Sequence, residues 1–398
     1  MMRDLASERI RWWDRLILCA VVLCSVLPAR GISFAYPETL GQGSADWLEG
    51  QSNPSITGIQ PIPGRQGLLV SYTIPPGDPL AFLIGRSWTY DDAVAAIGFL
   101  LQGKPDSART LLTTLQGLTF LDGTLGFSYQ VNSSFVDTRV RTGTLAWVGY
   151  AFALYQRVTG DNAFQSSAEK IAVYLRTLQL PSGSLKGGPD VNWVSTEHNI
   201  DAYFFYRELF RVTGNAGYGA TAEQIKSSLL SNHWVKTRSG GNFLQGLNDP
   251  TPSLDANSWG AIFLWAIGRS AEAAQALNYV ESNFRDTEAI SGSSDRIAGY
   301  SPDTRKRTIW LEGTVGVATT YQRIGNLAKT DSILDNVYKL QTTWISQGRW
   351  HSALPYSMPR YTNSSGDTFS DLESVASTGW MLITLAVRNG EGRFWDHD

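Results

Sequence analysis

The sequence predicts an all-α protein folded as an (α/α)6 toroid, a closed ring of six helical hairpins preceded by an extended lead-in. First, a glycine recurs along the chain, at Gly103, Gly160, Gly214, Gly268, Gly325 and Gly390. Second, each glycine separates a very apolar stretch from a more charged one. Third, the last apolar stretch, 372–387, lacks the polar face expected of a terminal repeat in an open array. We therefore expect a closed ring, with an open superhelix as the alternative.

The spacing of these glycines sets the size of the repeat. Successive intervals are 57, 54, 54, 57 and 65 residues. Such an interval is too long for one helix and a turn and fits one helix pair per repeat. The last interval is the irregular one, and it falls where the ring would close.

The first 35 residues are expected to form an export leader. Four arginines lie within residues 3–15, an uncharged run follows over 16–29, and Ser33-Phe34-Ala35 offers small residues for cleavage. The uncharged run is short for a membrane span. We interpret the leader as a cleaved signal peptide, with an uncleaved N-terminal anchor as the alternative.

Composition limits the cellular location and the partners. Cys19 and Cys24 both lie in the leader, so the mature chain would have neither a disulfide framework nor a cysteine metal site. Export without disulfides favours a bacterial protein that is periplasmic or secreted. The net charge is -3, and no basic run follows the leader, which argues against nucleic acid or a membrane surface as a partner. We expect a monomer.

Residues 36–85 are predicted to be the extended lead-in. This segment is rich in glycine, proline and serine, with one short apolar alternation over 68–74 that suggests a strand. Helical periodicity begins at Trp88, and no second domain boundary is visible after it. Residues 86–398 are therefore assigned to one helical-hairpin domain.

The helices fall into two sets. The first helix of each pair is apolar nearly all round, which indicates burial on both sides; the expected ranges are 89–102, 142–158, 196–213, 255–267, 309–324 and 372–389. The second helices carry charges along one stripe and are expected outside, over 105–118, 161–179, 217–233, 270–284 and 328–345. No twelfth helix is evident after Gly390. Either the ring is one outer helix short, or the segment before Trp88 supplies it.

The two kinds of connection are expected at opposite ends of the ring. Within a hairpin the turn is short, and its glycine adopts the left-handed conformation that ends a helix. Connections between hairpins run to about twenty residues and contain Gly-Gly, Pro and aromatic clusters. Long loops in a compact domain are more often functional than not. The functional site is therefore expected where the inner helices begin.

Ionisable residues in the inner helices concentrate in the first turns. They are Asp91, Asp92, Arg141, Glu197, His198, Asp201, Asp255, Glu312, Asp371 and Glu373. Capping of the free helical amides explains single acids such as Asp255 and Asp371. It does not explain the clustering of Glu197, His198 and Asp201 near one helix face.

Four acids are the candidate catalytic residues: Glu197, Asp201, Glu312 and Asp92. Glu312 stands alone in an uncharged helix, where a carboxylate is costly unless it faces water or a partner. Asp91 and Asp92 point about 100 degrees apart on a helix, so at most one of them faces the centre. Carboxyl groups that converge in a poorly hydrated cleft raise one another's pKa, which gives a protonated acid beside an ionised base.

Substrate-binding candidates lie in the same first turns and loops. They are Tyr90, Arg141, Trp147, Trp193, His198, Trp259, Trp310 and Trp380. Aromatic faces are common platforms for sugar rings, although each of these side chains taken singly fits core packing as well.

No cofactor and no metal site are predicted. His198 is the only histidine near the expected site, which excludes a histidine-rich metal centre. Calcium bound by carboxylates stays open as a possibility. The sequence has no phosphate-binding glycine loop, nucleophile elbow or metalloprotease helix motif.

Four segments resemble the six-hairpin glycosidase-like superfamily, in particular its uncharacterised exported bacterial members. They are Thr89-Tyr90-Asp91-Asp92-Ala93, residues 196–203, Trp310-Leu311-Glu312-Gly313-Thr314 and residues 374–380. The resemblance covers about residues 65–390 and implies an (α/α)6 fold and a role in carbohydrate metabolism.

Three functions stay open on this evidence. The leading hypothesis is an exported glycoside hydrolase that acts on an oligo- or polysaccharide through paired carboxyl groups. The second is a polysaccharide lyase or sugar epimerase that uses His198 with Tyr203 or Arg141. The third is a non-catalytic glycan-binding protein. A fold by itself does not decide among them.

Overall fold

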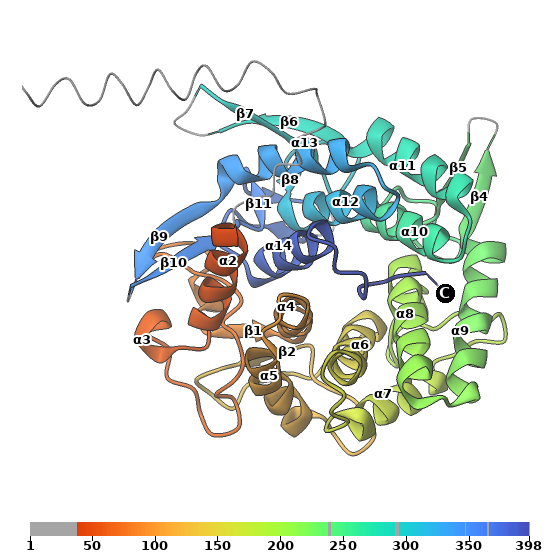
Figure 1. Cartoon of the computed structure of the whole chain (residues 1–398), viewed down its shortest axis with the longest axis horizontal. Helices are drawn as coiled ribbons and strands as arrows, with labels where there is room; N and C mark the ends of the chain where they lie inside the picture. Colours follow the sequence, from red (N-terminus) through yellow and green to blue (C-terminus); the bar gives the residue numbers. More distant parts are fainter. Residues whose placement is uncertain (1–37, 238–239, 291–293, 347, 364–365, 398) are drawn as a thin grey trace, which may run out of the picture. The chain divides into compact units, whose positions relative to one another are not determined.

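The computed structural model describes residues 38–237, 240–290, 294–346, 348–363 and 366–397. The predicted leader lies outside these ranges. Six helices form an inner ring in Figure 1, each at the place that the sequence predicts. They are α4 (Thr89–Leu101), α6 (Thr142–Thr159), α8 (Thr196–Thr213), α10 (Leu254–Ala266), α12 (Leu311–Arg323) and α14 (Val375–Arg388). The predicted (α/α)6 toroid is confirmed.

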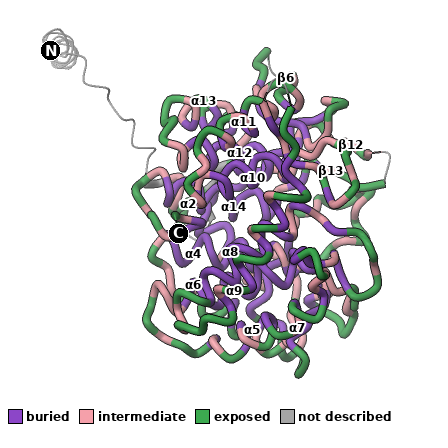
Figure 2. The backbone as a smooth tube through the Cα atoms, turned by 90° about the vertical axis from the view of Figure 1, so that its right-hand side faces the viewer, coloured by how far each residue is buried: buried purple, intermediate pink, exposed green. Residues whose placement is uncertain are grey.

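Five of the outer helices follow the inner ones directly. They are α5 (Pro105–Leu118), α7 (Gln165–Thr177), α9 (Ala216–Ser228), α11 (Ser270–Phe284) and α13 (Leu327–Val337). Each buries one stripe only: in α5 the buried residues are Ala108, Leu111, Leu112 and Leu115. Figure 2 shows the contrast with the inner helices, which are buried along almost their whole length. The glycines between paired helices adopt positive φ angles, from 68° at Gly214 to 82° at Gly325.

The twelfth helix comes from the lead-in. Helix α2 (Glu38–Gly50) lies outside the ring against α14 and β10 (Arg349–Ala353), between α13 and α5 in Figure 1. Its inner face buries Trp47 and Leu48, which are 1% and 0% exposed. The prediction of an extended lead-in missed this helix because three glycines lower its helix propensity. Close packing favours the helix all the same, since a Cβ atom at Gly43 would lie 2.7 Å from Ser352 Oγ.

The strand expected over 68–74 is not formed. Tyr72 makes one isolated bridge with Ser374, and other amides of the segment bond outside any sheet, as Val70 N–H does to Gln51 O at 3.0 Å. The segment instead holds the lead-in against the start of the ring.

Two glycines allow the ring to close between its last and first inner helices. A Cβ atom at Gly98 of α4 would lie 3.0 Å from Leu382 Cβ, and one at Gly379 of α14 would lie 2.9 Å from Val94 Cγ1. Gln102 Nε2 also donates to Leu382 O across this contact, at 2.9 Å. Helices α14 and α4 therefore pack with their backbones close together, and the array is a ring.

The long connections contain small antiparallel sheets. The strands are β1 (Arg86–Trp88), β2 (Ser128–Gln130), β3 (Val136–Asp137), β4 (Trp234–Thr237), β5 (Gly240–Phe243), β6 (Arg285–Ala289), β7 (Arg296–Tyr300), β8 (Ile309–Trp310), β9 (Thr342–Ser346), β10, β11 (Ser357–Met358), β12 (Tyr361–Thr362) and β13 (Thr368–Phe369). Short helical turns complete the described chain: α3 (Pro54–Thr57), η1 (Ala81–Leu83), η2 (Leu229–His233) and η3 (Tyr338–Leu340). Within the described ranges, no helix combines the length and hydropathy needed to cross a bilayer.

Candidate active site

One position of the repeat ties the preceding segment to the ring in five of the six inner helices. The fourth residue of five inner helices accepts a hydrogen bond from a backbone N–H of the preceding loop; these residues are Asp92, Asn199, Asn257, Thr314 and Thr378. The donor–acceptor distances lie between 2.7 Å, at Asn199, and 3.0 Å. The fourth position is therefore a structural anchor that holds the loops at the mouth, the end of the ring where the inner helices begin.

Asp92, a predicted catalytic residue, occupies this anchoring position. Its Oδ1 accepts from Leu69 N–H at 3.0 Å and its Oδ2 from the Ser87 hydroxyl at 2.7 Å. The side chain is 0% exposed, and burial raises its pKa. Both carboxylate oxygens are engaged inside the protein, so the geometry gives Asp92 a structural role in place of the expected catalytic one.

The second residues of the inner helices form the first layer of the mouth. They include Tyr90, Glu197, Asp255 and Glu312. Tyr90, Glu197 and Asp255 are only half-buried, whereas the residues of the next two turns of their helices are almost all buried. Solvent therefore reaches the inner ring at this layer, where three of its six helices place a carboxyl group.

Glu312 is held by a directed pair of hydrogen bonds. The Trp380 indole donates to the Tyr90 hydroxyl at 2.9 Å, and this hydroxyl donates to Glu312 Oε1 at 2.5 Å. Burial raises the pKa of Glu312 to about 8, against the opposing effect of the Tyr90 hydrogen bond. Glu312 is therefore a carboxylic acid that keeps its proton at neutral pH.

Glu197 and Asp255 form a pair of carboxyl groups on neighbouring helices. Burial raises the pKa of Glu197 well above its usual range, and the adjacent Asp255 and Asp201 raise it further. Asp255 also accepts from the Ser253 hydroxyl and from Ala256 N–H, so it supports the start of its helix as expected. The capping interpretation of Asp255 did not predict that its carboxyl group lies beside that of Glu197.

The sixth residues of the inner helices form a second layer directly below the first. Three are tryptophans, Trp147, Trp259 and Trp380, whose ring centroids lie 5.4 to 5.8 Å apart. A fourth is Asp201, which is 2% exposed. Burial raises its pKa, as does the nearby Asp255, and a contact with the Trp147 side chain opposes this effect. Three of the predicted aromatic residues thus form a floor at the level of one buried carboxyl group.

Three residues beside Glu312 were not among the predicted site residues. Asp91 is 6% exposed, and burial raises its pKa to about 7. The pKa of Tyr72 and that of Tyr356 are both raised by burial and by the carboxyl groups of Glu312 and Asp91. Both tyrosines come from irregular segments, so helical periodicity carried no signal for them. The sequence showed Asp91 next to Asp92 but did not indicate which of the two faces the mouth. The structure was needed to decide this.

The predicted residues Trp193, His198 and Arg141 lie together at the rim. Trp193 is 48% exposed, and its ring centroid is 5.4 Å from that of His198. Burial lowers the pKa of His198 to about 4, with a smaller contribution from the Arg141 charge, so the imidazole is neutral at pH 7. Arg141 pairs with Asp190 at 2.7 Å. A Cβ atom at Gly143 would lie 2.5 Å from His198 Cδ2, so glycine makes room for this ring.

Two further candidates differ in their surroundings. Trp310 lies at the start of α12, 7% exposed, with its ring 6.2 Å from that of Tyr356, and so lines the mouth. Tyr203 packs against Phe204 and Phe263 and is 1% exposed. Tyr203 is therefore part of the core, and the geometry does not support its use beside His198 in the lyase or epimerase alternative.

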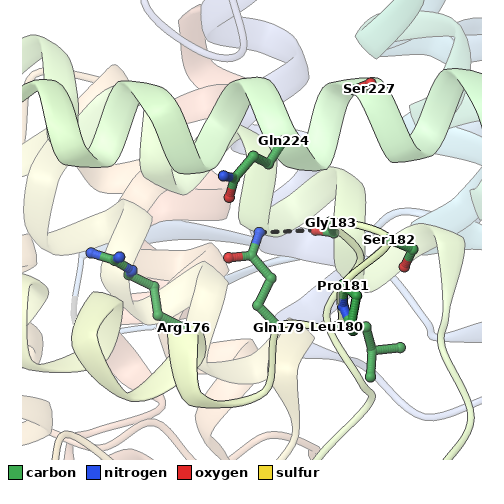
Figure 3. Close-up of a pocket in the computed structure, with 8 residues that line it drawn as sticks. All are labelled: Arg176, Gln179, Leu180, Pro181, Ser182, Gly183, Gln224 and Ser227. Carbon is green, nitrogen blue, oxygen red and sulfur yellow. Dashed lines mark hydrogen bonds between the residues drawn. The ribbon is translucent and has the colours of Figure 1, made fainter.

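Among the described residues, no predicted site residue belongs to a metal-binding cluster or lines the surface depression shown in Figure 3. The described residues contain no group of three or more His, Cys, Asp or Glu side chains placed to hold a metal ion. An open depression between α7 and α9, shown in Figure 3, is lined by Arg176, Gln179, Leu180, Pro181, Ser182, Gly183, Gln224 and Ser227. Gln179 Nε2 donates to Gly183 O there, at 3.0 Å.

Comparison with known proteins places the fold. No protein-family model matches the sequence, and no curated protein matches it significantly. Among solved structures, a glycosidase in complex with glucose is 12% identical, with a TM-score of 0.62 over 88% of this chain and 96% of that chain. A family 76 glycoside hydrolase, a mannosidase from Bacteroides thetaiotaomicron, is 11% identical, with a TM-score of 0.58 over 87% and 98%. A D-mannose isomerase is 10% identical, with a TM-score of 0.61 over 89% and 98%. The chain has the six-hairpin toroid fold of these proteins.

Proposed function

We propose that the protein is a glycoside hydrolase acting on an oligo- or polysaccharide. The observation that carries the proposal is the meeting of carboxyl groups from three inner helices, Glu197, Asp255 and Glu312, in the first layer. Glu312 holds its proton at neutral pH, and it is close enough to Glu197 to raise the pKa of that group. Glycoside hydrolysis requires one protonated acid and one ionised carboxylate on either side of the scissile bond.

Glu312 takes the role of general acid. Its proton would pass to the glycosidic oxygen as the bond to the leaving sugar breaks. Tyr90 fixes the carboxyl group through the 2.5 Å hydrogen bond, and Trp380 in turn fixes Tyr90. Positioning of this kind contributes to the rate because the acid needs no reorganisation at the moment of transfer.

The pair of Glu197 and Asp255 takes the role of the second carboxyl group. Burial and the adjacent Asp255 raise the pKa of Glu197. In this proposal the ionised form of the pair activates water or attacks the sugar carbon. The half-buried position of both side chains leaves them open to solvent.

Trp193 supplies a sugar contact in this proposal, since it offers an exposed face at the rim. Trp147, Trp259 and Trp380 are 1%, 2% and 0% exposed, so they support the first layer from below rather than touch the sugar. The similarity to a glucose-bound glycosidase and to a mannosidase supports a carbohydrate substrate.

A sugar isomerase or epimerase is the second candidate. The observation that favours it is His198, a neutral imidazole at the rim that could abstract a proton next to a sugar carbonyl. The D-mannose isomerase among the similar structures fits this chemistry. The hydrolase reading is preferred because the first layer is dominated by carboxyl groups rather than by histidine.

Export to the periplasm or the exterior of a bacterium is part of the proposal. It is supported by the arginine-rich start and the uncharged run over 16–29. Mass spectrometry of the protein recovered from a bacterial periplasm tests it: an N-terminus near residue 36 is expected, and an intact Met1 in the cytoplasm would contradict it.

The activity itself is tested with a panel of defined oligosaccharides. The protein should release new reducing ends from at least one of them, and Glu312→Gln should abolish the release while the circular dichroism spectrum is unchanged. Products that absorb in the ultraviolet would indicate a lyase. Tight binding without turnover would indicate a glycan-binding protein.

A further inference from the structure

The segment that follows α14, residues 389–397, runs back into the ring from the end opposite the mouth. In Figure 1 this dark blue segment passes inward from α14 toward the centre of the inner helices. It forms no regular secondary structure, yet Phe394 and Trp395 are 0% and 1% exposed. A polar tail on the surface would not bury two large aromatic rings.

Charged groups anchor the segment to three inner helices. Asp396 makes ion pairs with Arg157 of α6 at 2.6 Å and with Arg207 and Arg211 of α8, each at 3.0 Å. Arg323 of α12 donates to the carbonyl oxygen of Phe394. Since Arg157 and Arg207 are mostly buried, the carboxylate satisfies charges that would otherwise be costly.

The two aromatic rings of the segment support the second layer from below. Trp395 stacks on Phe204 with centroids 4.4 Å apart and an interplanar angle of 5°, and its ring lies 5.2 Å from that of Trp147. Phe394 meets Trp380 edge to face at 5.7 Å. The tryptophan floor is thus packed between the mouth and this segment.

This floor in turn holds the proposed acid. Trp147 meets the Tyr90 ring edge to face at 5.4 Å, and Trp380 donates to the Tyr90 hydroxyl. Tyr90 donates to Glu312. A continuous series of contacts therefore joins Phe394 and Trp395 to the carboxyl group of Glu312.

We propose that residues 389–397 are a positioning element of the active site. Phe394 and Trp395 hold the tryptophan floor so that Tyr90 keeps Glu312 in place, and they close the far end of the ring to water. The inference rests on the proposed function for its catalytic meaning, but its structural part does not.

Removing the two rings should act on Glu312 in a defined direction. Phe394→Ala with Trp395→Ala leaves a void beneath the floor, which lets the tryptophans shift. Asp396 and the arginines paired with it give water polar partners there. A weakened Tyr90 hydrogen bond would by itself raise the pKa of Glu312, but burial has the larger effect on this pKa. Hydration from below should therefore return this pKa toward the ordinary range of a glutamate.

The test measures the titration of Glu312 directly, by NMR of protein labelled at the glutamate carboxyl carbons. The Glu312→Gln variant assigns the signal. In the double variant the midpoint should fall from about 8 by roughly one pH unit or more. Trp350→Ala, which removes a ring that is 52% exposed on β10, is the matched control and should leave the midpoint unchanged. An unchanged midpoint in a folded double variant would overturn the proposal.

Conservative variants protect the test against a folding failure. Phe394→Leu and Trp395→Phe retain most of the packed volume and should fold, with a smaller shift of the midpoint in the same direction. If the double variant does not fold, and the Glu312 titration midpoint is unshifted in both conservative variants, the proposal is overturned.

Kinetics separate this inference from the proposed function. If the protein is a hydrolase, the double variant should lose about tenfold to a hundredfold in kcat with little change in KM, because the floor positions the acid rather than the substrate. A shifted Glu312 midpoint in a protein without hydrolase activity would refute the proposed function and leave the structural inference standing. If the double variant lost no more kcat than the control Trp350→Ala, the inference would be refuted and the proposed function would stand.

Discussion

The hydroxyl of Tyr90 donates a hydrogen bond to Glu312 Oε1 at 2.5 Å, although the two residues lie 222 positions apart in the chain. Both are the second residue of an inner helix. The ring therefore brings equivalent positions of its first and fifth hairpins into contact. This contact holds the proposed acid in place and lowers its pKa against the larger effect of burial.

Tyr90→Phe should raise the pKa of Glu312. The Tyr90 hydrogen bond lowers this pKa against the larger effect of burial, so its loss favours the protonated form further. The basic limb of the pH–rate profile should move to higher pH, and kcat should fall roughly tenfold because the acid is less well placed. Tyr279→Phe, on the outer helix α11, is the control and should change neither quantity. A basic limb that moves to lower pH would contradict the assignment.

Glu312→Gln and Glu197→Gln should be distinguishable by leaving group. An aryl glycoside with an acidic phenol needs little protonation, so Glu312→Gln should keep much of its activity on such a substrate while losing about 10²- to 10⁴-fold on an ordinary glycoside. Glu197→Gln should lose activity on both substrates.

Glu223→Gln is the matched control, because this side chain lies on the outer helix α9 and is 62% exposed. Equal losses of activity on both substrates in Glu312→Gln would show that Glu312 is not the general acid.

Glu312 should make the protein less stable as the pH rises. Its folded pKa of about 8 lies above the usual value of 4.5. Between these two values the unfolded chain releases the proton and the folded chain retains it. The free energy of unfolding should therefore decrease by about 1.4 kcal/mol per pH unit over this window from this group alone.

Glu312→Gln removes that dependence. Relative to the wild type, the variant should gain stability from pH 5 to pH 8, a trend that urea denaturation at several pH values measures. A difference in unfolding free energy that stays constant across this range would mean that Glu312 ionises normally in the folded protein.

Trp193→Ala should weaken substrate binding without impairing the chemistry. The ring is 48% exposed at the rim, beside His198, and stacking of a sugar on such a ring contributes about 1 kcal/mol. KM should rise roughly fivefold to tenfold at nearly constant kcat. A fall in kcat at constant KM would place Trp193 in the catalytic machinery instead.

Trp47→Ala tests whether α2 is an integral part of the ring. Trp47 is 1% exposed, and truncation of a buried tryptophan costs about 3–5 kcal/mol of unfolding free energy. Trp350→Ala, on an exposed side chain, should cost much less. Similar midpoints of denaturation for the two variants would show that the ring folds without support from α2.

The repeat was predictable from sequence because its signals are local. Glycine turns and apolar periodicity depend on neighbouring residues, so the inner helices were found within a few residues of their ends. Helix α2 was missed because its sequence has little helix propensity and its stability comes from contacts with residues such as Ser352, far away in the chain.

The site was predictable in part for the same reason. Glu197 and Glu312 stood out because a carboxyl group in an apolar helix is rare. Asp92 looked equally suitable, and only the hydrogen bonds from Leu69 and Ser87 reveal its anchoring role. A comparison of helix positions would have helped, since the fourth residue is polar in five of the six inner helices. Tyr72 and Tyr356 required knowledge of how the irregular segments fold over the mouth.

The measurement that tests the central claim most directly is hydrolysis in water enriched with heavy oxygen, followed by mass spectrometry of the products. If Glu312 and Glu197 carry out glycoside hydrolysis, the wild-type protein should place the heavy oxygen at the new reducing end of a cleaved glycan. Glu312→Gln and Glu197→Gln, both folded, should lose this incorporation on an ordinary glycoside. Cleavage without incorporation, or full incorporation in both variants, would contradict the account.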